Sequence, residues 1–167
     1  MIVVAIVGIL AAAAIPNFRR FQFRSKSAEA KTNLAAIRTA EVAHLAEFGF
    51  YVPASPSPPA YGGGRAIAFV DTGMTGANFH TIGFQPEGLI IFQYAVSVAG
   101  GAYTAEAAAD IDGNMVPQVW GYLMTDVSGN TAPGTLGCPG VWSPSSGMAE
   151  LTNVVGPCGG NFGLSEF

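Results

Sequence analysis

An acidic stretch at residues 110–114 has the residue types that open a calcium-binding loop: Asp110, Asp112, Gly113 and Asn114. In such loops, carboxylates at alternate positions are completed by a bidentate glutamate at the far end. That distal glutamate is missing here, and Asp-Gly between two strands is also a common hairpin turn. We therefore favour a turn at these residues over a calcium site.

The two histidines indicate structure more than chemistry. His44 lies in a stretch with helical periodicity and His80 in an expected loop, and neither belongs to a cluster of possible metal ligands. The chain also lacks Gly-x-Ser-x-Gly, His-Glu-x-x-His, phosphate-loop and dinucleotide-binding motifs, and the Cys-x-x-Cys-His motif of haem attachment. The sequence predicts no enzyme, no metal site and no cofactor.

Cys138 and Cys158 lie late in the chain, with nineteen residues between them. An even, sparse cysteine count in a segment rich in glycine and proline favours one disulfide in a protein that works outside the cytoplasm. Closing such a loop stabilises a fold by about 3 kcal/mol in the chain-entropy estimate. Two buried free thiols are the alternative. A metal site fits less well because no Cys-x-x-Cys or nearby histidine supplies further ligands.

The charges are distributed unevenly along the chain. Residues 1–48 carry six cations and three acids, net +3, whereas residues 49–167 carry one cation and eight acids, net −7, which together give −4. The acidic second part should repel nucleic acid, so we expect no direct binding. Four cations follow the apolar start of the chain: Arg19, Arg20, Arg24 and Lys26. They could lie at the headgroup level of a membrane, pair with acids of adjacent molecules, or form a solvated helix face.

The chain begins with an apolar run of fifteen residues, 1–15, without one charged or hydrogen-bonding side chain. A helix that is apolar on all sides must be buried in lipid or among other copies. The side chains expected to make these contacts are Met1, Ile2, Val3, Val4, Ile6, Val7, Ile9, Leu10 and Ile15. As a helix the run reaches only ~22 Å, less than the ~30 Å of a hydrocarbon core.

A cleavable signal peptide also contains a short apolar run, but its cations precede the run and a small-residue cleavage site follows it. In this chain nothing positive precedes Ile2, and the cations come after Pro16. We therefore expect the run to stay in the working protein.

Helical periodicity continues after Pro16, and neither glycine nor proline occurs between Asn17 and Phe48. Apolar residues recur every three or four positions and form one stripe: Leu34, Ile37, Ala40, His44 or Leu45, and Phe48. Charged residues are expected on the opposite face: Glu29, Lys31, Arg38, Glu41 and Glu47. The pattern predicts one helix over residues 1–48, kinked near Pro16, apolar all round over 1–15, amphipathic over 17–48 and ended by Gly49.

Residues 49–167 predict a head built from short strands. Residues 52–64 contain four prolines and three glycines, so we expect a surface connection without regular structure. Strand patterns begin at 66–70 and are stronger at 89–98, 102–111 and 116–125. The last three, separated by a glycine turn and an Asp-Gly turn, predict an antiparallel meander. The pattern is unclear after Asn130, where a disulfide would hold the tail. The predicted fold class is α+β.

The first 48 residues resemble the N-terminal helix of bacterial type IV pilins, especially those of Gram-negative bacteria. The resemblance is carried by the string MIVVAIVGILAAAAIPNFRRFQFRSKSAEAKTNLAAIRTAE, with its apolar run, Gly8, Pro16, Asn17-Phe18 and following cations. Beyond Phe48 only the architecture is similar: a loop, a meander sheet and a late cysteine pair that looks like the family's disulfide-bounded region.

The resemblance implies a pilin fold, in which the long helix packs against a small antiparallel sheet and Cys138 and Cys158 bound a C-terminal loop region. It implies a subunit that waits in the inner membrane and is polymerised by pilus assembly machinery into an extracellular filament of many copies. Filaments of this family unwind in the stretch that matches Gly8 to Pro16, so we expect loss of helix there on assembly, although the four alanines at 11–14 favour helix. The aromatic residues near both ends of the amphipathic half are expected to pack rather than conduct electrons.

The start of the chain departs from the family pattern. Processed pilins usually begin with a methylated phenylalanine and carry a glutamate shortly after it, both before the segment that matches Met1. We therefore expect about six residues before Met1, which would lengthen the apolar run to about 21, enough to cross a bilayer. Two other interpretations stay open: a pseudopilin of a type II secretion system, and a membrane-anchored protein whose acidic head binds a periplasmic ligand.

Overall fold

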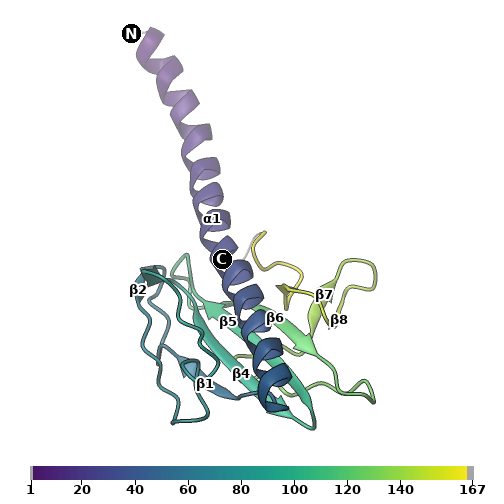
Figure 1. The fold of residues 1–167 in the computed structure, drawn as a ribbon. Helices are drawn as coiled ribbons and strands as arrows, with labels where there is room; N and C mark the ends of the chain where they lie inside the picture. The colour runs from purple at the N-terminus through teal and green to yellow at the C-terminus, as the bar shows by residue number, and fades with distance from the viewer. Residues whose placement is uncertain (1, 165–167) are drawn as a thin grey trace.

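A single long helix dominates the computed structural model, which describes residues 2–164. Helix α1 spans Ile2–Phe48, 47 residues, and its first half projects away from the rest of the molecule (Figure 1). The helix ends at Gly49, whose φ of +83° is the left-handed conformation of a helix C-cap. The Gly49 N–H donates to the Leu45 carbonyl at 2.8 Å. The predicted helix is confirmed, and it continues through Pro16 without interruption.

The head contains a five-stranded antiparallel sheet in the order β1-β4-β5-β6-β9. Its strands are β1 (Ala54–Ser57), β4 (Gln93–Ala99), β5 (Ala102–Ala109), β6 (Gln118–Met124) and β9 (Gly156–Pro157). The central three, β4, β5 and β6, form the meander that the sequence predicts. Two further pairs stand outside this sheet: β2 (Ile67–Ala68) with β3 (Leu89–Ile90), and β7 (Val141–Ser143) with β8 (Met148–Leu151).

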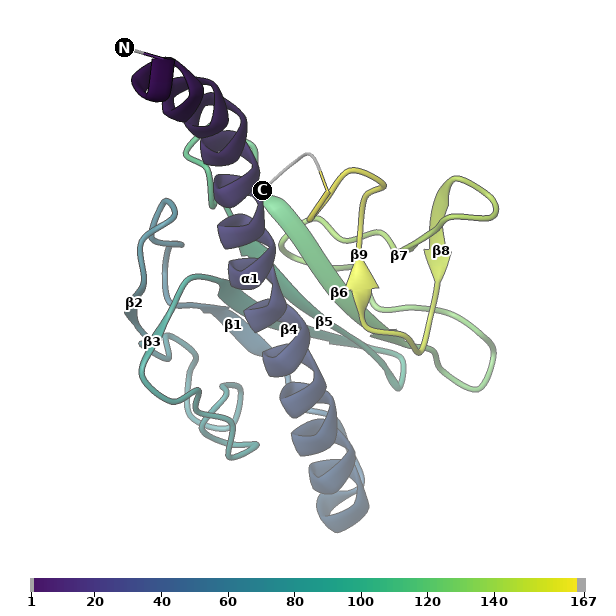
Figure 2. The ribbon, with the colours of Figure 1, turned by 90° about the horizontal axis from the view of Figure 1, so that it is seen from above.

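The second half of α1 lies across one face of the sheet (Figures 1 and 2). Residues of the C-terminal region, including both cysteines, pack against the other face. Ala30, Leu34 and Ile37 of the helix are fully buried in the main core together with aromatic residues of the sheet. On β5, Tyr103, Ala105, Ala107 and Ala109 belong to that core, whereas Ala108 packs with the cysteines in a second cluster. This alternation follows from the two-residue period of a strand, and burial on both faces explains the many alanines of β5. The α+β class and the pilin-like arrangement are confirmed.

Residues 52–64 differ from the predicted connection, because four of them form strand β1. Pro53 precedes this strand and Pro56 lies within it, and proline has no N–H to donate. The strand is at the edge of the sheet and pairs only with β4, which is where a sheet tolerates proline. Ser57 and Pro58 are buried rather than exposed.

The predicted strand at 66–70 is reduced to two residues, and the predicted strand at 89–98 is divided between β3 and β4. The division falls at Ile91 and Phe92, whose N–H groups donate to the Glu29 carboxylate of α1 instead of to a neighbouring strand. The Glu29 side chain therefore separates β3 from β4 by binding the backbone between them. The residue periodicity of a strand does not predict such a contact with a helix.

Candidate assembly site

The first half of α1 presents apolar side chains to solvent on every side. All residues from 2 to 22 are exposed, and Ile2 keeps 76% of its surface accessible. The predicted contact residues Ile2, Val3, Val4, Ile6, Val7, Ile9, Leu10 and Ile15 all belong to this segment, with Phe18 and Phe21 beyond them. Met1 was predicted with them and lies outside the described residues. By length and composition, α1 could cross a membrane. We call residues 2–22 the stalk.

Gly8 and Pro16 lie within continuous helix. A Cβ at Gly8 would meet nothing within 4 Å, so no contact requires glycine there. Pro16 removes one backbone donor from the helix, and next to it the Asn17 Nδ2 donates to the Ala13 carbonyl at 3.1 Å. Both residues lower the intrinsic helix preference of the stalk. The predicted unwinding between them on assembly stays a prediction.

The four predicted cations lie in two different environments. Arg19, Arg20 and Arg24 are exposed on α1 just beyond the apolar residues. Lys26 is half-buried, and its Nζ donates to the Gly64 carbonyl at 2.9 Å. Lys26 thus ties the loop before β2 to the helix within the subunit, while the three arginines are available for other contacts.

Two glutamates that the helical pattern assigned to the polar face instead anchor the second half of α1 to the head. The Glu29 carboxylate accepts from the N–H groups of Ile91 and Phe92 and from the Tyr94 hydroxyl, the last at 3.0 Å. Asn33 donates to the same hydroxyl at 2.7 Å. Burial, with the charge of Glu29 beside it, raises the pKa of Tyr94, so this phenol stays protonated.

Glu41 is the second anchor, and it is fully buried. One carboxylate oxygen accepts from the Val52 N–H at 3.0 Å, and the other has no hydrogen-bond partner within the described part of the chain. Burial raises the pKa of Glu41 to about 7, although the Val52 hydrogen bond opposes the shift. The assignment of Glu41 to the solvent-facing side was therefore wrong, because the chain after Gly49 turns back over this face of the helix.

His44 has a structural role at the end of the helix. It is buried, and its Nδ1 lies 3.0 Å from the Phe50 carbonyl, so this nitrogen carries the proton and donates. Its ring lies between those of Phe48 and Phe50, at centroid distances of 4.6 and 5.0 Å.

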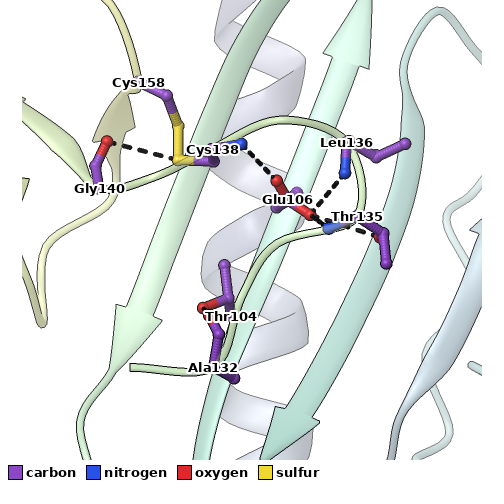
Figure 3. Close-up of a disulfide and its surroundings, with 8 residues drawn as sticks. All are labelled: Thr104, Glu106, Ala132, Thr135, Leu136, Cys138, Gly140 and Cys158. Atoms are coloured by element: carbon purple, nitrogen blue, oxygen red, sulfur yellow. Dashed lines mark hydrogen bonds between the residues drawn. A yellow bond between two sulfur atoms is a disulfide. The ribbon is translucent and has the colours of Figure 1, made fainter. Parts of the chain in front are cut away.

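The predicted disulfide joins Cys138 to Cys158 and lies against β6 (Figure 3). A Cβ on Gly121 would lie 2.5 Å from the Cys138 Sγ, so glycine is required where the disulfide crosses the strand. Beside it, the buried Glu106 carboxylate accepts from the N–H groups of Thr135, Leu136 and Cys138. Sequence reasoning missed Glu106, because its partners are backbone groups of a distant loop.

The acidic stretch at 110–114 forms a turn. The Asp110 carboxylate accepts from the N–H groups of Gly113, Asn114 and Met115, so its oxygens stabilise the backbone. His80 is exposed, and its backbone N–H donates to Asp71. Within residues 2–164, no three His, Cys, Asp or Glu side chains are grouped as a metal site would need.

In sequence, the chain is 40% identical over 111 residues to the "Type IV major pilin protein PilA" of Myxococcus xanthus (strain DK1622). The match covers 66% of this chain and 40% of that protein, so the chain spans less than half of the relative's length. No protein-family profile matches the chain, and no solved structure matches it significantly. Identity at this level, together with the long helix, the antiparallel sheet and the late disulfide, confirms the resemblance found in the N-terminal residues.

Proposed function

We propose that this chain, which is similar to a type IV pilin in sequence and in fold, is a structural subunit that polymerises through its stalk into an extracellular pilus filament. The observation that carries the proposal is the stalk itself: a regular helix whose large apolar side chains are all exposed in the subunit. Transferring one such side chain from water to an apolar environment is favourable by ~1.5 to 3 kcal/mol. Water is therefore an unfavourable environment for the whole stalk.

Two environments can bury the stalk, and the proposed cycle uses both. Before assembly the stalk lies in the inner membrane, with Arg19 and Arg20 at the headgroup level. In the filament it packs among the stalks of other copies, delivered by pilus assembly machinery. Because burial among copies replaces burial in lipid, the subunit needs no catalytic group, and its role is structural.

The test is the composition of surface fibres. Fibres sheared from cells that express the full protein are examined by electron microscopy, and their main component is identified by mass spectrometry. Long fibres made chiefly of this chain support a pilin. Absence of the chain from surface fibres, with the protein retained in the inner membrane, would instead favour a pseudopilin or an anchored binding protein.

A pair of variants links fibre formation to the stalk. Val7→Asp places a charge in the middle of the apolar segment, where insertion of a charged residue into a bilayer costs ~2.5 to 3.5 kcal/mol. Val127→Asp places the same charge on an exposed loop of the head. We expect the first variant to lose surface fibres and the second to keep them. Equal fibre yields from the two variants would contradict the proposal that the subunits polymerise through the stalk.

A further inference from the structure

Two hollows lie beside the second half of α1. The larger has a volume of about 470 Å³ and is lined by Trp120, Trp142, Phe162 and Lys31, among others. The smaller, about 270 Å³, shares Lys31 and Trp120 and adds Arg24. We call the two hollows together the aromatic groove. It is bordered by α1 on one side and by β9 and residues 160–164 on the other.

The charged side chains of the aromatic groove are basic and come from α1, whereas the head is acidic. Arg24 and Lys31 lie seven residues apart and so share a face of α1, and the Lys31 Nζ lies 4.8 Å from the centre of the Trp120 ring. None of the described residues that line the groove is acidic. Residues 49–167, in contrast, carry one cation and eight acids. An anionic segment with an apolar side chain is therefore the complementary occupant.

The same chain carries such a segment in the turn between β5 and β6. Met115 and Val116 expose 89% and 48% of their surfaces, and Asp112 is exposed beside them. We call residues 112–116 the acidic tip. It combines one anion with two apolar side chains that the fold of the subunit does not bury.

The acidic tip is held in a fixed shape. Met115 has a φ of +69°, a left-handed conformation that costs a non-glycine residue ~1 to 2 kcal/mol. The buried Asp110 holds it there by accepting from the Met115 N–H at 3.0 Å and the Gly113 N–H at 2.8 Å. Because the tip is already ordered, docking it into a partner loses little conformational entropy.

We propose that the aromatic groove of one subunit receives the acidic tip of a second copy of this chain. Subunits of an open helical polymer touch through two different patches, and the groove and the tip are such a pair. The Met115 thioether packs against the aromatic rings, and Asp112 lies near Lys31 and Arg24. This contact rests on the proposed function and adds to it a second interface, in the heads, besides the packing of the stalks.

The test is cross-linking between two singly substituted chains in one filament. Cells co-express Met115→Cys and Ala28→Cys, where Ala28 is an exposed residue that lines the groove. A short thiol-specific cross-linker is added to sheared filaments, and covalent dimers are counted. Since each chain carries one added cysteine, a 115–28 dimer arises only between subunits. Val127→Cys, on a fully exposed loop, replaces Met115→Cys in the matched control.

We expect 115–28 dimers, few 127–28 dimers, and little product when either variant is assembled alone. Filaments that form normally but give no 115–28 dimers would overturn this contact and leave the proposed function intact. Dimers from the 127–28 pair instead would assign the groove to another segment and also overturn it. If the unsubstituted chain forms no filaments, the proposed function fails first.

Charge reversal gives a second readout in the same filaments. Lys31→Glu in the Ala28→Cys chain, or Asp112→Lys in the Met115→Cys chain, should each lower the fraction of 115–28 dimers, and the two together should restore it. If neither reversal changes this fraction, the acidic tip does not face the groove.

Discussion

Glu106 illustrates how a carboxylate is buried when backbone N–H groups supply its hydrogen bonds. It is fully buried on β5, and the N–H groups of the 135–138 loop supply its hydrogen bonds. A Cβ at Gly134 would lie 2.3 Å from one of its oxygens, so the loop can approach only because that residue is glycine. One side chain thereby fixes the loop that leads into the disulfide.

Replacing Glu106 with glutamine tests this role. An amide offers one acceptor oxygen, and its NH₂ group then points at backbone N–H donors, so a buried donor loses its partner. We expect Glu106→Gln to lower the free energy of unfolding by about 1 to 3 kcal/mol. Urea unfolding of the detergent-solubilised chain measures this free energy. Glu87→Gln, at an exposed position, is the control and should change nothing. Equal stability of the two variants would contradict the anchoring role.

Gly121 tests the packing of the disulfide against β6. A methyl group there would overlap both sulfurs, at 2.5 and 2.9 Å, so Gly121→Ala forces the strand or the disulfide to shift. We expect a loss of about 1 to 3 kcal/mol in the free energy of unfolding. In a background where Cys138 and Cys158 are both alanine, the same substitution should cost much less. An unchanged cost in that background would mean that the sulfurs are not what glycine accommodates.

At the scale of elements, α1 was the easiest part of the fold to predict and its polar contacts were the hardest. Helical periodicity identified its length and the buried positions Leu34, Ile37 and His44, because these depend on neighbours along the chain. Phe48 was wrongly included in the buried stripe: it lies in the last turn of the helix and is 57% exposed. Glu29 and Glu41 were placed on the wrong face because their partners, Ile91 and Val52, are set by tertiary structure. An acidic residue beside an apolar stripe therefore marks either a solvated edge or a buried anchor, and the sequence alone does not separate the two.

Strands followed the same rule. β5 and β6 were predicted to within two residues at each end because a glycine turn and an Asp-Gly turn delimit them. β1, β7, β8 and β9 were missed because each has four residues or fewer and pairs with a strand far away or across an irregular turn. The disulfide was predictable from cysteine count and composition, whereas the groove beside it depends on β9 and residues 160–164 meeting α1.

Glu41 makes the attachment of α1 to the head depend on pH. In the folded protein burial raises the pKa of Glu41 to about 7, against an ordinary value of 4.5. Between these values the unfolded chain releases a proton that the folded chain keeps, so the free energy of unfolding falls as pH rises, by about 3 kcal/mol in total. Below this window both states are protonated, and above it both are charged.

The measurement is the unfolding free energy from pH 4.5 to pH 8 for the wild type, Glu41→Gln and Glu47→Gln. Glutamine at 41 does not titrate, so this variant should lose the decrease. Glu47 is exposed on the same helix, and its variant should follow the wild type. A wild type as stable at pH 8 as at pH 5.5 would show that Glu41 is already ionised in the folded state.

In the stalk, we expect the helix between Gly8 and Pro16 to unwind on assembly. Gly8 and Pro16 lower helix stability by about 1 and 3 kcal/mol relative to alanine, and new contacts in a filament can exceed these amounts. We expect a helical reconstruction of the filament to show unwound backbone between Gly8 and Pro16. The double variant Gly8→Ala with Pro16→Ala should keep the helix there or assemble poorly. Continuous helical hydrogen bonds from Val7 to Phe18 in wild-type filaments would contradict this prediction.

At the scale of the whole molecule, the main feature is the separation of charge. Cations gather along α1, at the stalk and at the groove, while most of the acids belong to residues 49–167. A subunit with net charges of +3 and −7 on its two parts is an electrostatic dipole. When the head of one copy lies against the stalk of another, opposite charges come together. When head lies against head, or stalk against stalk, like charges repel. Charge therefore favours a staggered, polar arrangement over a symmetric pair.

Reversing the charges of Arg19 and Arg20 tests this arrangement. Both are exposed at the base of the stalk, and in a filament they would face acids of the neighbouring head. Arg19→Glu with Arg20→Glu should reduce filament yield strongly, because attraction becomes repulsion and the headgroup-level cations are lost as well. Arg65→Glu, an exposed reversal on the head, is the control and should assemble normally.

The amount of subunit in the inner membrane separates the two possible causes of such a loss. If the doubly reversed chain inserts as well as the wild type but forms few filaments, the arginines act between subunits. If insertion itself fails, they act at the membrane. Attraction between exposed charges also weakens with salt, because the screening length falls from ~10 Å at 0.1 M to ~3 Å at 1 M. Wild-type filaments should therefore dissociate more readily at high salt if the first cause holds. A filament yield unaffected by the double reversal would show that Arg19 and Arg20 do not help to order the subunits.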